Sequence, residues 1–396
     1  MRTPWLAALL IFTAITPAYA ADSEGAGPVR FRAHVIEPDI ANGYQTVIVD
    51  LNRDGKPDVI GLSGRLPALY WYENPGWERH VISDGHNRMI TVAAADLDGD
   101  GIPELGLGTD FGQTESASEG RVFVLEHQGD PRQPWKPTEI DRLPTTHRMR
   151  FADIDGDGKP ELINSPLTGK GAAAPLFECN TPLVYYTPAD WKRHEIYDAL
   201  GGVTHGMYEA KWDGSGRDAI LTASMGGVWL HRAYPGLLRL DWTHQRLTSG
   251  DPSERPKVGA SEIRVGQLGA ARFLATIEPW HGNEVVVYTA DGKGGWQRQV
   301  IDDSFDDGHA VNVVDFDGDG RDEIVAGYRA AGAKLYLYSS MDASGKSWHR
   351  ETLDPDGMTA AGCDTADLNA DGRVDLVCIG SRTANIKWYE NLGPAK

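Results

Sequence analysis

The sequence has few cysteines and few basic residues, and both shortages limit what the protein can be. Cysteine occurs 3 times in 396 residues, and no pair has the spacing of a zinc site. The 38 Lys and Arg are outnumbered by 57 Asp and Glu, so the formal net charge is −19. This acidity argues against nucleic acid or an anionic membrane surface as a partner. The sequence also has no P-loop, dinucleotide fingerprint or Ser-centred nucleophile elbow.

Long apolar runs are equally scarce, and the one near the start has the form of a secretory signal. Arg2 precedes an apolar stretch, residues 5–15, and a small-residue cleavage site, residues 18–20. We therefore expect residues 1–20 to be a signal peptide and residues 21–28 to be a short flexible segment. No other segment is apolar enough to span a membrane. The sequence predicts a protein exported to the periplasm or the extracellular space, with no membrane insertion.

One acidic motif, D-x-[DN]-x-D-G-x-x-[DE], occurs five times. The copies begin at Asp50, Asp96, Asp153, Asp315 and Asp367. Each places oxygen ligands at positions one, three, five and nine, with the turn-forming Gly at position six, as in a short loop around Ca²⁺. The sequence thus predicts up to five structural calcium ions. Their expected ligands are Asp50, Asn52, Asp54, Asp58, Asp96, Asp98, Asp100, Glu104, Asp153, Asp155, Asp157, Glu161, Asp315, Asp317, Asp319, Glu323, Asp367, Asn369, Asp371 and Asp375.

Each loop lies between two short β-rich runs, and two further runs follow it. The third run carries aromatic residues, as in Leu69–Tyr72, and the fourth carries Trp or Arg, as in Trp77–Ile82. Four short strands separated by turn residues are typical of one propeller blade. Two degenerate copies, Lys211–Ala219 and Arg264–Arg272, bring the loop starts to seven, spaced 46 to 58 residues apart. Both begin with a basic residue, Lys211 or Arg264. Its positive charge either substitutes for a missing calcium ion or is the result of neutral sequence drift in the loop.

The ends of the repeat array predict how the ring closes. A fourth-strand pattern occurs at Val29–Ile36, before any loop, whereas the last repeat has no fourth strand of its own. The N-terminal strand should therefore complete the C-terminal blade, which removes exposed sheet edges. We predict an all-β fold, a seven-bladed β-propeller over residues 29–396. Cys363 and Cys378 flank the last loop symmetrically, so they are either a disulfide or two small buried residues.

The loops, their spacing and the Trp-Tyr-Glu-Asn sequences at 71–74 and 388–391 resemble the FG-GAP/VCBS repeat family. The resemblance covers essentially all of residues 29–396 and implies a Ca²⁺-decorated seven-bladed propeller. That family includes integrin-type binding heads, secreted adhesins, carbohydrate lyases and the propeller portion of aldos-2-ulose dehydratase. The resemblance therefore implies the fold more strongly than the function.

Histidine recurs at one position of the repeat. The residues six before the loop starts are Tyr44, Ile90, His147, His205, Val258, His309 and Ala361. Residues at one offset should share one level of the channel, on the face opposite the calcium loops. Three neutral imidazoles converging there suit Zn²⁺, Mn²⁺ or Fe²⁺. The alternatives are hydrogen-bonded channel fillers, or a metal-free site that uses His as acid or base.

Several other residues are expected on the same face and complete a catalytic hypothesis. A metal held by His147, His205 and His309 would polarise a ketone or uronate carboxylate and acidify the adjacent C–H. His281 or Tyr44 would be the base or acid, and Arg329 and Arg382 would hold substrate oxygens. Glu278, in the unusual Glu-Pro-Trp-His-Gly segment of the fifth blade, is a further catalytic candidate.

This hypothesis describes a metal-dependent carbohydrate lyase, dehydratase or isomerase acting on an anionic or keto sugar. The main alternative is a non-catalytic extracellular propeller in which Ca²⁺ rigidifies the ring and the same face binds a glycan or a protein. A third possibility, a structural subunit of a cell-surface assembly, has less support, since no linker, extra domain or anchor is visible.

Overall fold

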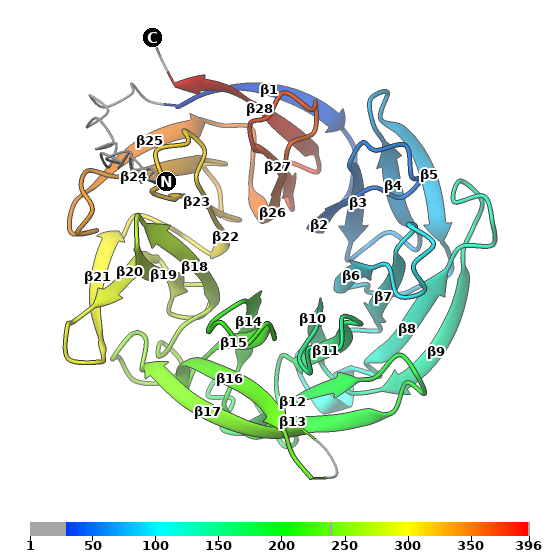
Figure 1. Cartoon of the computed structure of the whole chain (residues 1–396), viewed down its shortest axis with the longest axis horizontal. Coiled ribbons are helices and arrows are strands. Elements are labelled where there is room, and N and C mark those ends of the chain that lie inside the picture. The colour runs from blue at the N-terminus through cyan, green and yellow to red at the C-terminus, as the bar shows by residue number, and fades with distance from the viewer. Residues whose placement is uncertain (1–28, 238–239, 395–396) are drawn as a thin grey trace, which may run out of the picture.

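A computed structural model describes residues 29–237 and 240–394, which form seven four-stranded antiparallel sheets arranged around a central axis (Figure 1). The predicted signal peptide, residues 1–20, and the predicted flexible segment, residues 21–28, lie outside the described residues. The seven-bladed β-propeller predicted from the sequence is confirmed. The described residues contain no α-helix, only a 3₁₀ turn, η1 (Glu115–Ala117).

Each blade has four strands, which we number from the innermost, next to the axis, to the outermost. The inner strands are β2 (Gly43–Val49), β6 (Thr91–Ala95), β10 (Thr146–Ala152), β14 (Thr204–Ala210), β18 (Glu262–Leu268), β22 (Gly308–Val314) and β26 (Ala360–Ala366). The second strands are β3 (Asp58–Ser63), β7 (Glu104–Thr109), β11 (Glu161–Pro166), β15 (Ala219–Ser224), β19 (Ala271–Glu278), β23 (Glu323–Tyr328) and β27 (Asp375–Gly380).

The two outer ranks follow the same order. The third strands are β4 (Leu69–Glu73), β8 (Arg121–Glu126), β12 (Asn180–Tyr186), β16 (Gly227–Pro235), β20 (Glu284–Ala290), β24 (Leu335–Ser340) and β28 (Ile386–Pro394). The outermost strands are β5 (Glu78–Ser83), β9 (Lys136–Arg142), β13 (Arg193–Gly201), β17 (Leu240–Thr248), β21 (Trp296–Asp302), β25 (Trp348–Asp354) and β1 (Val29–Glu37).

The ring closes as the sequence predicts. β1, the first strand of the chain, pairs antiparallel with β28, the last, and Ala33 lies opposite Tyr389. Figure 1 shows these two strands side by side at the edge of the seventh blade. Closure pairs the first strand with the last, so neither is left as an open sheet edge.

Burial explains why the strands differ in composition by rank. The second strands are covered on both sides by neighbouring blades, and six of the seven are buried at every residue. The outermost strands are more exposed, and β17 alternates partly buried with exposed residues over most of its length. The core therefore lies mainly between adjacent blades, such as the cluster around Trp71 and Phe123 of blades one and two. Such a sheet gives near-continuous apolar runs in its middle and alternation at its rim.

The two degenerate loops turn out differently from each other. Lys211 begins a loop as predicted, and its Nζ lies 2.8 Å from the carbonyl oxygen of Gly216 and 3.0 Å from Oδ1 of Asp218. Its ammonium thus binds two oxygens of its own loop. The prediction of a loop at Arg264–Arg272 is wrong. There β18 continues to Leu268 and pairs directly with β19, which begins at Ala271, so Arg264 lies within an inner strand.

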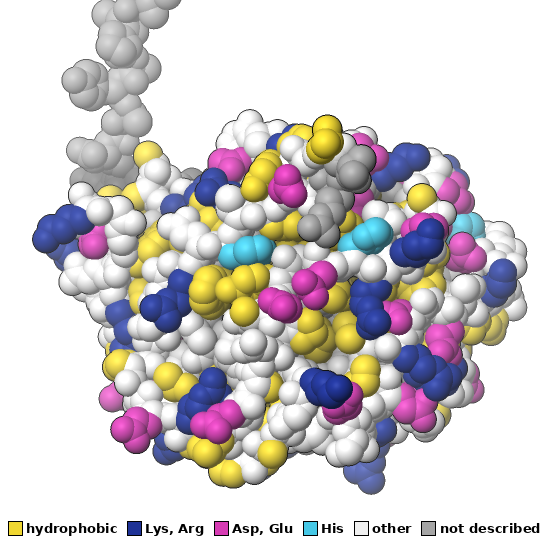
Figure 2. All heavy atoms as spheres, turned by 90° about the horizontal axis from the view of Figure 1, so that it is seen from below, with side chains coloured by type: hydrophobic (Ala, Val, Ile, Leu, Met, Phe, Trp, Pro, Cys, Tyr) yellow, Lys and Arg dark blue, Asp and Glu magenta, His cyan; other side chains and the backbone are white. Residues whose placement is uncertain are grey.

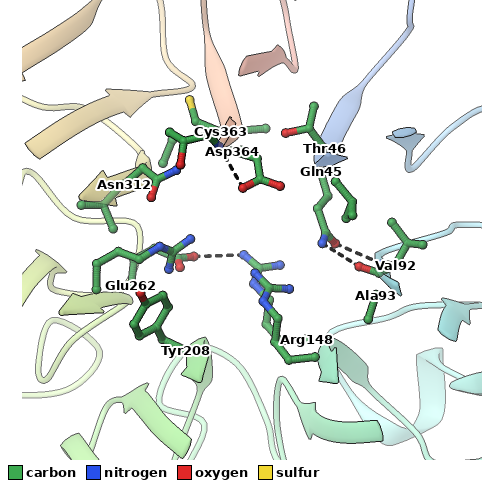
Figure 3. A pocket seen from close by; sticks show the side chains of 18 of the residues that line it. Gln45, Thr46, Val92, Ala93, Arg148, Tyr208, Glu262, Asn312, Cys363 and Asp364 are labelled. Atoms are coloured by element: carbon green, nitrogen blue, oxygen red, sulfur yellow. Dashed lines mark hydrogen bonds and ion pairs between the residues drawn. The ribbon is translucent and has the colours of Figure 1, made fainter. Parts of the chain in front are cut away.

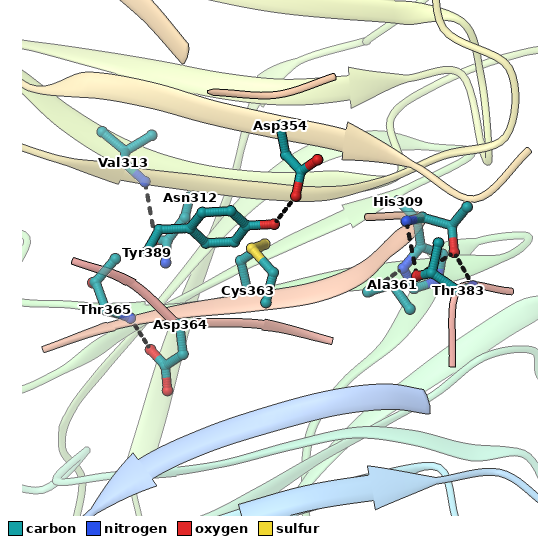
Figure 4. Close-up of a disulfide and its surroundings, with 12 residues drawn as sticks. His309, Asn312, Val313, Asp354, Ala361, Cys363, Asp364, Thr365, Thr383 and Tyr389 are labelled. Carbon is teal, nitrogen blue, oxygen red and sulfur yellow. Dashed lines mark hydrogen bonds between the residues drawn. A yellow bond between two sulfur atoms is a disulfide. The ribbon is translucent and has the colours of Figure 1, made fainter. Parts of the chain in front are cut away.

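Cys363 and Cys378 form a disulfide between β26 and β27, where they are directly opposed (Figure 4). The sequence left open a disulfide or two small buried residues, and the structure has the disulfide. The bridge joins an inner strand to its neighbour beside Asp364, whose side chain faces the central channel.

The outer surface is mixed in charge. In the side view of Figure 2, Lys and Arg side chains are interspersed with Asp and Glu over the rim of the ring. None of the helices in the described part of the chain is long and apolar enough to cross a membrane.

A buried histidine in the fourth blade makes stability depend on pH. His231 of β16 is fully buried, with Nε2 3.1 Å from Oγ1 of Thr222 and Nδ1 3.0 Å from Nδ1 of His244. Burial lowers the pKa of His231 from 6.5 to about 3. The unfolded chain therefore binds a proton first as pH falls. The stability due to neutral His231 is complete above pH 6.5 and declines from there towards pH 3.

We expect His231→Gln to flatten this acid limb, because Gln keeps a polar group but does not titrate. In the wild type, each pH unit below 6.5 should cost about 1.4 kcal/mol from this residue alone. Urea unfolding at several pH values measures the slope, and the exposed His349→Gln is the matched control. Equal slopes in wild type and His231→Gln would contradict the assignment.

Candidate metal centre

Three histidines from three separate elements come together at one end of the channel. His205 is the second residue of β14, His309 is the second residue of β22, and His281 belongs to the turn between β19 and β20. One ring nitrogen from each lies within 4.8 Å of the other two. The Nε2 atoms of His205 and His281 are 3.1 Å apart. Two ligands of a tetrahedral Zn²⁺ are about 3.4 Å apart when each bond is about 2.1 Å, so this pair fits a metal.

The hydrogen bonds of His205 fix which nitrogen faces the group. Its Nδ1 lies 2.8 Å from Oε1 of Glu262, and the same carboxylate lies 3.0 Å from Nη2 of Arg148. An imidazole that donates Nδ1–H to a carboxylate presents the lone pair of Nε2, which is the usual arrangement of a metal-binding His. The side chains of His205, Glu262 and Arg148 are all almost fully buried.

His309 shows the same arrangement more directly. Its Nδ1 donates to the carbonyl oxygen of Ala361, and its Nε2 is buried without a hydrogen-bond partner among the described residues. A buried polar atom without a partner is unusual and indicates a missing ligand. This lone nitrogen belongs to the group of three, so the donor set fits a bound cation.

His281 is the accessible member of the group. Its side chain is 25% exposed, and its backbone has φ of 50°, a left-handed conformation that turns the ring inward. Nδ1 lies 3.1 Å from Nη2 of Arg329 and 3.4 Å from Oδ1 of Asp307. A protonated Nδ1 would donate to Asp307, and an unprotonated one would accept from Arg329, so either tautomer has a partner.

Burial keeps these imidazoles neutral. It lowers the pKa of His205 to about 4, and it lowers the pKa values of His281 and His309 well below the usual range. Nearby cationic groups, including Arg148 and Arg329, act in the same direction. Neutral imidazole is the form that binds a metal, so the site is prepared for one at neutral pH.

The structure differs from the sequence prediction in one member of the triad. His147 was expected with His205 and His309, but His281 takes that place. His147 lies next to the group, with its ring centroid 4.7 Å from that of His205, and its Nε2 is 2.7 Å from the hydroxyl of Tyr44. A common offset fixes the level of a residue in the channel but not the direction of its side chain, and His281 comes from a turn.

The other catalytic candidates lie in different surroundings. Tyr44 borders the site, and its hydroxyl accepts from Nη1 of Arg148 at 3.0 Å. Arg329 donates to both carboxylate oxygens of Asp307, whereas Arg382 is exposed and its side chain makes no hydrogen bond among the described residues. Glu278 is fully buried inside the fifth blade, against Arg298, Tyr288 and Thr276. Glu278 is thus placed as a structural anchor rather than beside the imidazoles.

The five acidic loops predicted to bind calcium lie at the opposite ends of the inner strands from the His group. In three of them, ligand oxygens from positions one, three and nine lie within 4.8 Å of one another. These are the loops with Glu at position nine, which begin at Asp96, Asp153 and Asp315. In the two loops with Asp at position nine, both oxygens of that Asp accept backbone N–H groups. Asp58, for example, accepts from Leu51 and Asn74, each at 2.9 Å.

Sequence comparisons identify the repeat. A family model of FG-GAP-like repeats matches residues 50–107 and 315–378, and a model of the aldos-2-ulose dehydratase β-propeller domain matches residues 119–291. The propeller therefore contains FG-GAP-like repeats at residues 50–107 and 315–378. The resemblance deduced from the acidic loops is thereby confirmed. No curated protein was found to match the chain.

A solved structure shares the fold. It is the extracellular domain of a protein described as a one-component system from B. thetaiotaomicron, with a TM-score of 0.52 and 14% sequence identity. The match covers 88% of this chain and 39% of that one. At this identity the likeness shows the fold alone.

The electrostatics of the acidic loops also fit a cation. Burial and the neighbouring Asp carboxylates raise the pKa of Glu323 to about 8 and that of Glu161 to about 7. Carboxylates crowded together out of water resist ionisation unless a cation balances them. The residues present therefore suit Ca²⁺.

Sequence reasoning missed three charged residues around the His group, namely Arg148, Glu262 and Asp307. Arg148 and Glu262 line a cavity of about 320 Å³ in the channel, which also reaches Tyr44 and His309 (Figure 3). The repeat pattern does not mark Glu262, because blade five has no acidic loop from which its register could be counted, and no other blade repeats Arg148 or Asp307 at the same offset from its loop. Their proximity to the imidazoles depends on how the inner strands converge.

Proposed function

We propose that this propeller is an exported, Ca²⁺-stabilised enzyme that uses one transition-metal ion, Zn²⁺, Mn²⁺ or Fe²⁺, held by His205, His281 and His309. The reaction would be a carbohydrate elimination or isomerisation, of the lyase, dehydratase or isomerase type. The observation that carries this proposal is the convergence of three neutral imidazoles, two of them buried, one of which has a nitrogen without a hydrogen-bond partner among the described residues.

The chemistry follows from the surrounding residues. A metal at this position would polarise a ketone or carboxylate oxygen and make the neighbouring C–H more acidic. Tyr44 is placed to move a proton, since its hydroxyl lies 2.7 Å from Nε2 of His147 and borders the channel cavity. Arg148 holds the Tyr44 hydroxyl and Glu262, which in turn orients His205. His281 then serves as a ligand instead of a base.

The comparisons support the same reading. The match to the aldos-2-ulose dehydratase propeller, residues 119–291, contains His205, Glu262 and His281. The name of that enzyme describes a dehydration of a keto sugar, which is the chemistry proposed here. Export is supported by the signal-like residues 1–20 and by the Cys363–Cys378 disulfide, which suits an oxidising compartment.

Metal analysis with matched variants tests the proposal. Purified mature protein should contain about one Zn, Mn or Fe per chain, and His205→Ala/His309→Ala should lose this metal while retaining calcium. His147→Ala should keep the metal but lose activity in a screen of keto-sugar and uronate substrates. The exposed His349→Ala is the control and should change neither. Calcium as the sole metal in all four proteins would overturn the proposal.

One observation favours a second function. His205 and His309 are 1% and 2% exposed, so a substrate on the channel face would reach the group chiefly past His281. This limited access also suits a non-catalytic propeller that binds a glycan or a protein, with the imidazoles as channel fillers. Glycan-array binding without turnover, together with calcium as the sole metal, would support this alternative.

A further inference from the structure

Two arginines in the channel have unused hydrogen-bond donors. Arg150 of β10 and Arg264 of β18 both line the 320 Å³ cavity, as does Tyr208 of the intervening β14. Cζ of Arg264 lies 5.3 Å from the Tyr208 ring centroid. Nη1 of Arg150 donates to Met149 and Nη1 of Arg264 to Ile263, in each case to a backbone carbonyl. The Nη2 groups of both arginines have no hydrogen-bond partner among the described residues.

The carboxylates that line the cavity accept no hydrogen bond from Arg150 or Arg264. The two carboxylate oxygens of Asp364 accept hydrogen bonds from the backbone N–H groups of Ile48 and Thr365, at 3.1 and 2.9 Å. Glu209 approaches Nε of Arg150 at 3.5 Å, and its Oε2 makes no hydrogen bond. Glu262 is occupied by Arg148 and His205. Arg150 and Arg264 thus share one water-accessible space with Glu209, Glu262 and Asp364, but none of these carboxylates accepts a hydrogen bond from either guanidinium group.

Burial makes this arrangement costly for the unliganded protein. It lowers the pKa of Arg150, and the nearby charges of Arg264 and Arg148 lower it further, partly offset by Glu209. Like charges held together in a partly buried space are stabilised by an anion that pairs with both. By contrast, Arg329 on the channel face is already paired with Asp307 by two hydrogen bonds.

We propose that Arg150 and Arg264 form a binding site in the channel for a small hydroxylated carboxylate, such as a sugar acid. A planar carboxylate matches the fork of a guanidinium group, which presents two parallel N–H donors. The cavity volume suits a ligand of monosaccharide size. Asn312 offers its amide Nδ2, since its Oδ1 accepts from Val313, and Glu209 can accept from ligand hydroxyls. Figure 3 shows Asn312, Asp364 and Tyr208 around the same opening.

This site shares its cavity with His309 but uses none of the proposed metal ligands, so its test is a binding measurement. Isothermal titration calorimetry of the mature protein should show binding of D-glucuronate and none of uncharged D-glucose. Acetate is expected to bind more weakly, and equal binding would mean that the site recognises any free carboxylate and would overturn the hydroxylated-ligand assignment. Arg150→Gln and Arg264→Gln should each weaken D-glucuronate binding at least tenfold.

Three further variants keep the outcome unambiguous. Arg232→Gln, at an exposed ion pair with Asp213, should bind like the wild type. Arg264→Lys keeps the charge without the planar fork, so binding should fall between wild type and Arg264→Gln even if the latter folds poorly. His205→Ala/His309→Ala should retain binding whether or not the protein holds a transition metal. Loss of binding in that double variant, or wild-type binding in Arg264→Lys and Arg264→Gln, would overturn the site.

Discussion

We expect removal of calcium to lower the melting temperature of this protein by about 10 °C. This expected result follows from the three loops whose carboxylates already lie within 4.8 Å of one another. If each ion is present at about a hundredfold excess over its Kd, each site contributes about 2.7 kcal/mol, or about 8 kcal/mol for three. For a chain of this length, that corresponds to a shift of about 10 °C.

The physical reason is electrostatic. Without a cation, burial and then repulsion from the neighbouring Asp carboxylates disfavour ionised Glu323, which is why the pKa of Glu323 is raised to about 8. Scanning fluorimetry with calcium and with a strong chelator measures the shift. Asp315→Asn should remove roughly a third of it, and Glu115→Gln, an exposed acid outside the loops, should remove none. A melting temperature that chelation leaves unchanged would show that the loops do not bind calcium.

Replacing one buried asparagine should destabilise the ring by about 3 kcal/mol or more. Asn391 of β28 is fully buried, and its Nδ2 donates to the carbonyl oxygens of Phe316 and Val374, at 2.8 and 3.1 Å. Its Oδ1 accepts from the N–H of Gly393 at 2.8 Å. Asn391→Ala leaves three buried backbone groups without partners, each costing about 1–3 kcal/mol.

The contact with Phe316 explains why the effect reaches beyond one blade. Phe316 is the second residue of the calcium loop of blade six, so Asn391 ties blade seven to its neighbour. Urea unfolding of Asn391→Ala measures the loss, and Asn87→Ala, at an exposed asparagine, should change the free energy of unfolding by less than about 0.5 kcal/mol. A loss as small in Asn391→Ala as in Asn87→Ala would contradict this role.

Asn391 also shows which features a sequence repeat can predict and which it cannot. The sequence contains Trp-Tyr-Glu-Asn twice, ending at Asn74 and Asn391, so it marks both positions as equivalent. In the structure, Asn74 donates to Leu368 of blade seven as Asn391 donates to Phe316 of blade six. The motif predicts that the two residues do the same thing, but only the ring shows that each joins two blades.

The candidate site was predictable in part. Equal offsets from the loop starts identify His205 and His309, because register along an inner strand sets the level of a residue in the channel. The offsets also select His147, which instead contacts Tyr44, and they omit His281, which a turn brings in at φ of 50°. Arg264 was assigned to a loop and instead lines the channel, because blade five replaces the loop with a tight hairpin.

The sequence alone determined the fold, the number of blades, the closure of the ring by Val29–Glu37 and the positions of the acidic loops. Each of these follows from patterns that repeat along the chain, and a period in sequence becomes a period in space. Tertiary structure decided which imidazoles meet, which arginines are already paired and where the cavity lies. Those features depend on side chains from blades far apart in sequence that meet only at the axis, where no local pattern records their directions.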